Sequence, residues 1–224
     1  MKYAPHAIFL ALVAILLVGA RFGFAWAGGS GHVSTLSVFL QDATGPVTAE
    51  RNGVVRTLAL DDRIYRGETI ATAPGSFAQL TISDFSHIVT VGMDERTSLT
   101  VDALTVTKPE LFLHGGRIET FMDGTVDGLN VRTNFTRSSL GKGRASFVNY
   151  DFKEAVAIVP IVGSVTTTAT KTDETRTTAT AIGIHETDPV AFDEIGFNRD
   201  AATVKPFYDW IETRFGLEAF EIKQ

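Results

Sequence analysis

Cysteine is absent from the 224-residue chain. Its absence excludes disulfide bridges, thiol catalysis and zinc sites that are built on thiolates. A chain of this length buries about 70% of its unfolded surface, so it can fold without such cross-links. Hydrophobic residues make up 44% of the sequence and charged residues 21%. This balance excludes a disordered tail, a collagen and a coiled coil.

Acidic residues are missing from the first 40 positions, although the chain contains 26 of them and has a net charge of −6. The acidic balance argues against nucleic acid as a partner. In residues 1–27 only Lys2 and Arg21 are charged, and between them lies the apolar run Ala7–Ala20. An apolar run of this length behind a basic N-terminus is typical of a secretory signal peptide. Ala25-Trp26-Ala27 fits the small-residue cleavage site of such a peptide.

A membrane anchor is the alternative, because Ala7–Ala27 is 21 residues long and a spanning helix needs about 20. Arg21 could then snorkel to the interface. We therefore predict that residues 1–27 are a signal peptide or a membrane anchor, with cleavage favoured. Residues 28–44 are predicted to form a linker and the first strand. Both readings place the body outside the cytoplasm, in the periplasm or on the cell surface.

Short strands are predicted from residue 33 to about 183. Apolar and polar residues alternate in Arg56–Leu60 and in Phe77–Ile82. Ala155–Val162 is almost wholly apolar, which predicts a strand buried on both faces with Pro160 at a bulge or an edge. Turn signals separate such runs at Asn52-Gly53, Arg66-Gly67, Pro74-Gly75, Gly115-Gly116, Asp123-Gly124 and Asp127-Gly128. The pattern predicts an all-β fold, with a sandwich, a barrel and a solenoid as the alternatives.

Two C-terminal segments differ from this pattern. Val165–Thr180 contains nine threonines, which predicts a hairpin that is solvated on both faces and has a weakly fixed register. A disordered or O-glycosylated stalk is the alternative. Val204–Phe215 has apolar residues at helical spacing, with Pro206 suited to the first turn and Gly216 to the C-cap. We expect one amphipathic helix that docks on the β body.

The body resembles the FecR domain, named for a periplasmic regulator of iron-siderophore uptake. The resemblance covers residues 45–183 and depends on the order of short motifs at Gly67–Thr72, Gly75–Leu80, Ser83–Ser86, Leu111–Ile118 and Val131–Thr133. Glu68 stands where the family usually has Asp, and Phe85 where it usually has Gly. The resemblance implies a twisted, solenoid-like or sandwich-like β body, with residues 184–224 as a C-terminal extension that carries the docked helix.

FecR regulators also carry a cytoplasmic helical segment that holds a sigma factor. The stretch before Ala7 is too short for such a segment, so the anti-sigma role is not expected. The resemblance therefore implies an exported or anchored FecR-like protein that binds another protein in envelope signalling or assembly. We expect no bound cofactor.

Chemistry-bearing motifs are weak, and we predict no catalytic, cofactor-binding or metal-binding residues. His185-Glu186 with Asp188 is interpreted as a solvated polar patch, and Asp61-Asp62 as part of a turn. Asp123–Gly128 lacks the ligands of a calcium loop and is interpreted as two turns. The basic stretch Arg137–Arg144 includes Gly141-Lys142-Gly143, which does not match a phosphate loop. We interpret that stretch as a solvated loop.

The sequence is compatible with three functions. The first is the non-enzymatic protein-interaction module, which would bind by strand addition at an exposed edge. The second is a glycan-binding envelope domain, which requires two or three aromatic side chains in one groove. Its candidates are Tyr65, Phe112, Phe121 and Tyr150. An envelope-polymer hydrolase is the third, and it would need two carboxylates that face each other across a cleft.

Overall fold

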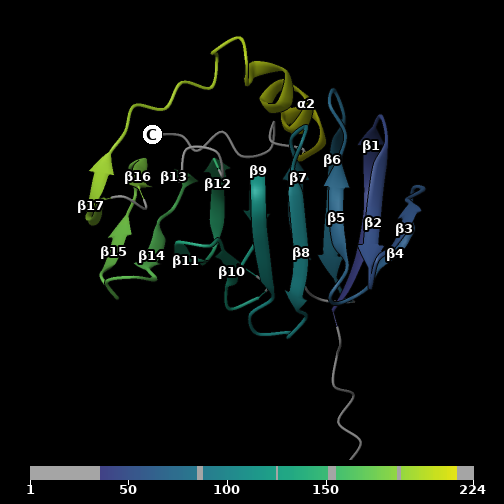
Figure 1. The fold of residues 1–224 in the computed structure, drawn as a ribbon, viewed down its shortest axis with the longest axis horizontal. Coiled ribbons are helices and arrows are strands. Elements are labelled where there is room, and N and C mark those ends of the chain that lie inside the picture. The colour runs from purple at the N-terminus through teal and green to yellow at the C-terminus, as the bar shows by residue number, and fades with distance from the viewer. Residues whose placement is uncertain (1–35, 85–87, 125, 151–154, 186–187, 216–224) are drawn as a thin grey trace, which may run out of the picture. The chain divides into compact units, whose positions relative to one another are not determined.

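A computed structural model describes residues 36–84, 88–124, 126–150, 155–185 and 188–215 (Figure 1). All of them belong to one compact unit that begins at Thr35. The predictions for residues 1–27 and for most of the linker lie outside the described residues. The elements are β1 (Ser37–Thr44), β2 (Val47–Arg51), β3 (Val54–Thr57), β4 (Arg63–Ile64), β5 (Thr69–Thr72), β6 (Phe77–Ser83), β7 (Ile88–Met93), β8 (Ser98–Ala103), β9 (Glu110–Met122), β10 (Leu129–Arg132), β11 (Thr136–Leu140), β12 (Gly143–Tyr150), β13 (Ala155–Val162), β14 (Val165–Ala169), β15 (Thr175–Thr178), β16 (Ile182–His185), β17 (Asp188–Glu194) and α2 (Lys205–Phe215).

The strands form two layers, which we name sheet A and sheet B. Sheet A has the order β4-β1-β6-β7-β9-β12-β13-β16-β17. Sheet B has the order β3-β2-β5-β8-β9-β10-β11-β14-β15. β9 belongs to both, and its pairing with β10 is parallel while the other pairings are antiparallel. After β9 the chain visits the sheets in alternating hairpins, so the fold combines a sandwich with the steady advance of a solenoid. The predicted all-β class is confirmed.

A bend at Gly115-Gly116 carries β9 from one sheet to the other. Gly115 pairs with Ser98 in sheet B, and Gly116 pairs with Asn149 in sheet A. Gly116 has φ +93°, and a Cβ at this position would lie 2.4 Å from Thr97 Oγ1. Only glycine fits both requirements. The prediction of a turn at this dipeptide is therefore wrong, because the glycines permit a bend within the longest strand.

The inner faces of the two sheets share one apolar core. Ala78, Leu80 and Ile82 are fully buried on β6, as their alternation predicts. Ile70 of β5 and Leu99 of β8 are fully buried in the same core from sheet B. Period-two alternation along each strand therefore fixes which face points inward.

The strand predicted at Arg56–Leu60 ends early. β3 stops at Thr57, and Leu60 is 57% exposed. The backbone turns here because Asp61 has φ +65° and the Asp62 carboxylate accepts a hydrogen bond from Ala59 N at 2.9 Å. The turn role predicted for Asp61-Asp62 is thus confirmed, and it shortens the predicted strand.

Pro160 lies beside a break in the β12–β13 register. The register shifts between Arg144 and Ala145, which pair with Val162 and Pro160. β16 pairs with β13 only from Ala155 to Ile158, so Pro160 lies beyond this pairing, where one side of β13 is an edge. Proline is tolerated where no ladder donor is needed. The predicted strand and its bulge are confirmed, but burial on both faces is largely confined to its first five residues, and Val162 at its end is exposed.

The threonine-rich segment forms the predicted hairpin, β14–β15, but only one of its faces is solvated. Thr167 is fully buried, and its hydroxyl lies 3.0 Å from the Ser138 hydroxyl on β11. β14 also pairs along its whole length with β11. The buried face fixes the register, so the prediction of a weakly fixed register is wrong.

The predicted C-terminal helix is confirmed as α2, which begins one residue later than expected. Its buried residues Phe207, Tyr208 and Ile211 form a second apolar cluster against the outer face of sheet A. A Cβ on Gly92 would lie 2.4 Å from Ile211 Cδ1, so the glycine allows the helix to approach β7 closely. Over the described residues, no helix reaches the length and apolar character needed to span a bilayer.

Candidate protein-interaction edge

The edge formed by β3 and β4 carries exposed apolar side chains. We use the term β3–β4 edge for residues 54–66. Val54 is 71% exposed and Val55 is 60% exposed. The preceding Asn52-Gly53 turn has φ values of 53° and 77°, as a two-residue hairpin of type I′ requires. The turn signal in the sequence therefore gives a hairpin whose outer strand faces solvent.

β3 pairs with β2 alone among the described strands. Val54 pairs with Arg51 and Arg56 with Ala49 across the two-residue turn. In a hairpin of this length these are the hydrogen-bonded pairs, so the N–H and C=O groups of Val55 point away from β2. Leu58 N donates to Val47 O at 2.9 Å, which agrees with this alternation. β3 therefore presents free backbone donors and acceptors.

A buried carboxylate holds this edge in place. Glu68 has a side chain that is 7% exposed, and it accepts hydrogen bonds from Arg56 Nη2 at 3.0 Å and from Tyr65 N at 2.8 Å. Arg56 Nη2 also donates to Arg63 O at 2.7 Å. The hydrogen bond that the Arg56 guanidinium donates to the Glu68 carboxylate raises the pKa of Arg56. Because these contacts tie β3 to β4, the exposed strand is held in an extended conformation.

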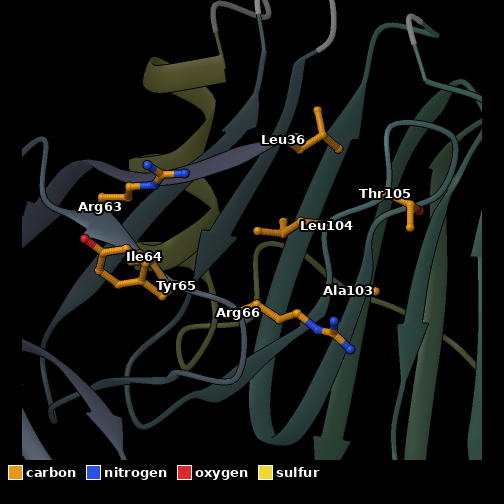
Figure 2. Close-up of a pocket in the computed structure, with 8 residues that line it drawn as sticks. All are labelled: Leu36, Arg63, Ile64, Tyr65, Arg66, Ala103, Leu104 and Thr105. Atoms are coloured by element: carbon orange, nitrogen blue, oxygen red, sulfur yellow. The ribbon is translucent and has the colours of Figure 1, made fainter. Parts of the chain in front are cut away.

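A depression of about 530 Å³ adjoins the edge (Figure 2). The Arg63 guanidinium lies 5.6 Å from the centre of the Tyr65 ring. Arg66 Nε donates to Asp102 O at 2.7 Å. Figure 2 shows Leu36 and Leu104 between the Arg63–Tyr65 pair and Thr105. The depression thus combines an apolar floor with an aromatic ring and two cationic side chains.

The structure distributes the four aromatic candidates for a glycan site. Tyr65 lines the depression beside β4, whereas Tyr150 lines a separate one of about 480 Å³. The ring centroids of Phe112 and His114 on β9 lie 4.5 Å apart, and Phe121 is half-buried on the same strand. Neither phenylalanine lines either depression. The two depressions therefore do not assemble the aromatic groove that the glycan hypothesis requires.

The basic stretch Arg137–Arg144 is not a solvated loop, and that prediction is wrong. It forms β11, a short turn and the start of β12. Arg144 is buried, and its Nε donates to the carboxylate of Glu119. Lys142 stays exposed in the turn. Pairing of both strands with their neighbours brings the arginine under α2.

The acidic and histidine candidates lie partly outside the described residues. His185 is exposed at the end of β16, but Glu186 is not described. In the Asp123–Gly128 stretch, residue 125 is likewise not described. Among the residues that the structure does describe, no group of three or more acidic, histidine or cysteine side chains could hold a metal ion.

Sequence reasoning missed a layer of charged side chains between sheet A and α2. Arg117 Nη1 donates to Asp94 Oδ2 at 3.0 Å, and the Ser146 and Tyr208 hydroxyls lie 2.9 Å apart. Glu119 is fully buried, and burial raises its pKa. Burial also raises the pKa of Asp94 to about 6 and that of Tyr208 to about 12.

The alternation of residues on β9 explains why the sequence does not predict this layer. Arg117 and Glu119 alternate with inward residues on β9, a pattern that normally marks the solvent face of a strand. Only the docking of α2 shows that this face is covered. Two contacts link this layer to the helix: the Ser146 hydroxyl lies beside the Tyr208 hydroxyl, and the Arg117 guanidinium lies 5.7 Å from the centre of the Tyr208 ring.

No family model matches the chain, and no curated protein matches it. Two solved structures from Parabacteroides distasonis ATCC 8503, each described as a putative anti-sigma factor, show partial similarity. Their identities are 15% and 14%, and both TM-scores are 0.48. The matched regions cover 62% and 64% of this chain, and 63% and 64% of the neighbours' own length. Similarity at this level does not assign a function.

Proposed function

We propose that this protein is a non-enzymatic interaction module of FecR type that acts outside the cytoplasm, in envelope signalling or assembly. The open β3 strand is the observation that carries the proposal. Strand addition derives affinity from main-chain hydrogen bonds and specificity from pockets for alternate side chains. β3 offers main-chain hydrogen bonds through Val55, and the depression beside Tyr65 offers a pocket for a side chain.

Of the four edge strands in the described residues, β3 is the one left open. Proteins normally protect edges by short strands, charged side chains or proline. β4 has two residues, and β17 contains Pro189. β15 carries threonines and Arg176 in place of large apolar residues. β3 has none of these protections, and Val54 and Val55 are exposed on it. A binding role would explain this exposure.

The depression suggests the chemistry of the partner segment. An extended segment that pairs with Val55 would lie near β4, because Arg56 of β3 donates a hydrogen bond to Arg63 O, and Arg63 and Tyr65 could then reach it. A carboxylate on that segment could pair with a guanidinium, and an apolar side chain could cover Leu104. We therefore expect an extended peptide that carries both apolar and acidic residues.

The absence of catalysis is part of the proposal, and the engagement of the buried carboxylates supports it. Glu68, Asp94 and Glu119 each pair with an arginine. Each of these carboxylates is already engaged by an arginine, which leaves it less available to accept a proton from a substrate.

Site-specific photo-crosslinking tests the proposal. A crosslinker placed at Val55 in the full chain should give a discrete protein adduct in the cell envelope, whereas one at Val162, another exposed valine, should not. Val54→Lys should abolish the Val55 adduct, because a charged side chain blocks edge pairing. Equal adducts at both positions would contradict the proposal. A purified glycan that binds the Val54→Lys variant as well as the original protein would favour the glycan-binding alternative.

A further inference from the structure

The open strand β3 lies at the margin of the described unit (Figure 1). An open edge with exposed apolar side chains promotes uncontrolled association, and β3 exposes Val54 and Val55. The other edge strands in the described residues carry their own protection, because β4 is short, β17 contains Pro189 and β15 is polar. A symmetric pair of copies that join through β3 would cover both open strands at once. Such a pair is closed, so it leaves no open β3 strand for a third copy.

The backbone of β3 is complementary to itself at Val55. The N–H and C=O groups of Val55 point away from β2, because the hydrogen-bonded pairs of the hairpin are Val54 with Arg51 and Arg56 with Ala49. When a two-fold axis passes beside Val55, the β3 strands of two copies run antiparallel. Val55 N then donates to Val55 O of the second copy, and the reverse hydrogen bond forms by symmetry.

Charge and strand length select this register. A register centred on Arg56 places two guanidinium groups directly opposite each other, and like charges in that position destabilise a strand pair. Registers centred on Val54 or on Thr57 pair much of β3 with the turns that flank it. The register centred on Val55 keeps the pairing within β3 and places each Val54 opposite an Arg56.

We propose that β3 pairs with β3 of a second copy in this register, and that this pairing regulates access to the edge. The inference deepens the proposed function and rests on it, because β3 must be able to accept an added strand. β3 has four residues, whereas a standard stable interface buries about 1,600 Å². The pair is therefore weak and reversible, and it covers the edge until a partner segment displaces the second copy.

The composition of β3 explains why an acidic partner displaces the second copy. The strand reads Val54-Val55-Arg56-Thr57 and contains no acidic residue. A second copy therefore brings apolar side chains to the edge but no carboxylate from β3 for the nearby Arg63 guanidinium. A partner segment that carries a carboxylate can add this ion pair to the same main-chain hydrogen bonds. The two modes of binding exclude each other, because both use the backbone of Val55.

Disulfide cross-linking tests the pairing directly, because the chain has no cysteine. In the full chain, Val55→Cys places two Cα atoms about 5.5 Å apart across the axis, which a disulfide can bridge. Thr57→Cys is the matched control, since Thr57 is exposed on the same face of β3, and its two copies would lie about 14 Å apart along the strands. Mild oxidation should convert at least about tenfold more of the Val55→Cys chain into a species of twice the mass. Equal conversion of the two variants, or no dimer from Val55→Cys, would overturn the proposal.

Charge at position 54 tests the register. Val54→Lys places a cation opposite Arg56 of the second copy, and it should abolish the dimer in sedimentation velocity of the full chain in mild detergent. Val54→Glu places a carboxylate opposite the same guanidinium twice in each pair, and it should strengthen the dimer severalfold. Loss of the dimer in both variants would contradict this register.

The pairing and the proposed function can fail separately. A photo-crosslinked adduct at Val55 whose mass differs from twice that of the chain, without a disulfide dimer from Val55→Cys, would remove the pairing and leave the proposed function intact. A disulfide dimer without such an adduct would support the pairing and count against a separate partner.

Discussion

Arg144 donates a hydrogen bond to Glu119 beneath α2, and the two side chains are 6% and 0% exposed. The residues lie on the neighbouring strands β12 and β9. Both point to the outer face of sheet A, where the helix excludes water from them. In this buried position, either charge would be strongly destabilised without the other.

Removal of one partner should therefore cost more stability than removal of both. Glu119→Leu removes the carboxylate that pairs with the buried Arg144 guanidinium, and we expect it to lower the free energy of unfolding by about 3 kcal/mol. The double variant Glu119→Leu/Arg144→Met should recover most of that loss. Urea denaturation measures both. Asp209→Asn, which breaks the exposed pair with Lys205, is the control and should change stability by less than about 1 kcal/mol. A double variant as unstable as the single one would contradict this.

The carboxyl of Asp94 should titrate near pH 6. Burial raises its pKa to about 6, against the opposing effects of the Glu95 backbone N–H and the Arg117 guanidinium. The folded protein then binds a proton that the unfolded chain has already lost between about pH 4 and 6. Stability from this group is therefore present at low pH and lost as the pH rises toward 6. NMR titration of the carboxyl carbon checks the midpoint. A midpoint near 4, or an unchanged pH profile of stability in Asp94→Asn, would show that the ion pair outweighs burial.

Gly92→Ala should loosen α2. The new Cβ would lie 2.4 Å from Ile211 Cδ1, and overpacking of this kind costs about 1–3 kcal/mol. Hydrogen exchange of the α2 amides should become faster than in the original protein. Gly141→Ala is the matched control, because a Cβ there would meet nothing within 4 Å. Ile211→Ala combined with Gly92→Ala should relieve the clash; if it does not, the close approach is not the cause.

Thr167 and Thr166 should respond differently to the same change. Thr167→Val removes a buried hydroxyl that lies 3.0 Å from Ser138, so Ser138 loses its partner and stability should fall by about 1–2 kcal/mol. Thr166→Val replaces an exposed hydroxyl that pairs with Thr177, and should change stability by less than about 0.5 kcal/mol. Thermal denaturation of the two variants compares them directly. Similar losses would mean that the hairpin is solvated on both faces, as the sequence alone predicts.

Local patterns were sufficient for the parts of this fold that depend on neighbouring residues. The alternation at Ala78, Leu80 and Ile82 gave the inward face of β6. The Asn52-Gly53 dipeptide gave a hairpin turn because both positions need positive φ. The apolar residues of Phe207–Ile211 gave the docking face of α2. In each case the physical cause lies within a few residues of the chain.

Contacts between distant segments could not be predicted in the same way. Arg144 looked solvated because nothing near it in sequence indicates Glu119 or the helix above it. Gly115-Gly116 looked like a turn because the crossing between sheets depends on Thr97 and Asn149. The sequence does not indicate the role of Glu68, because its partner Arg56 lies 12 residues away on β3.

β9 has a mechanical consequence for the molecule. It pairs with β7 and β12 in one sheet and with β8 and β10 in the other. Strands β1–β8 and β10–β17 are therefore two half-sandwiches that share a single central strand. Without it, each half would expose an unpaired edge in both sheets at once. A load or a denaturant that extracts β9 should open both halves together, so the centre of the chain should set the resistance of the whole body to unfolding.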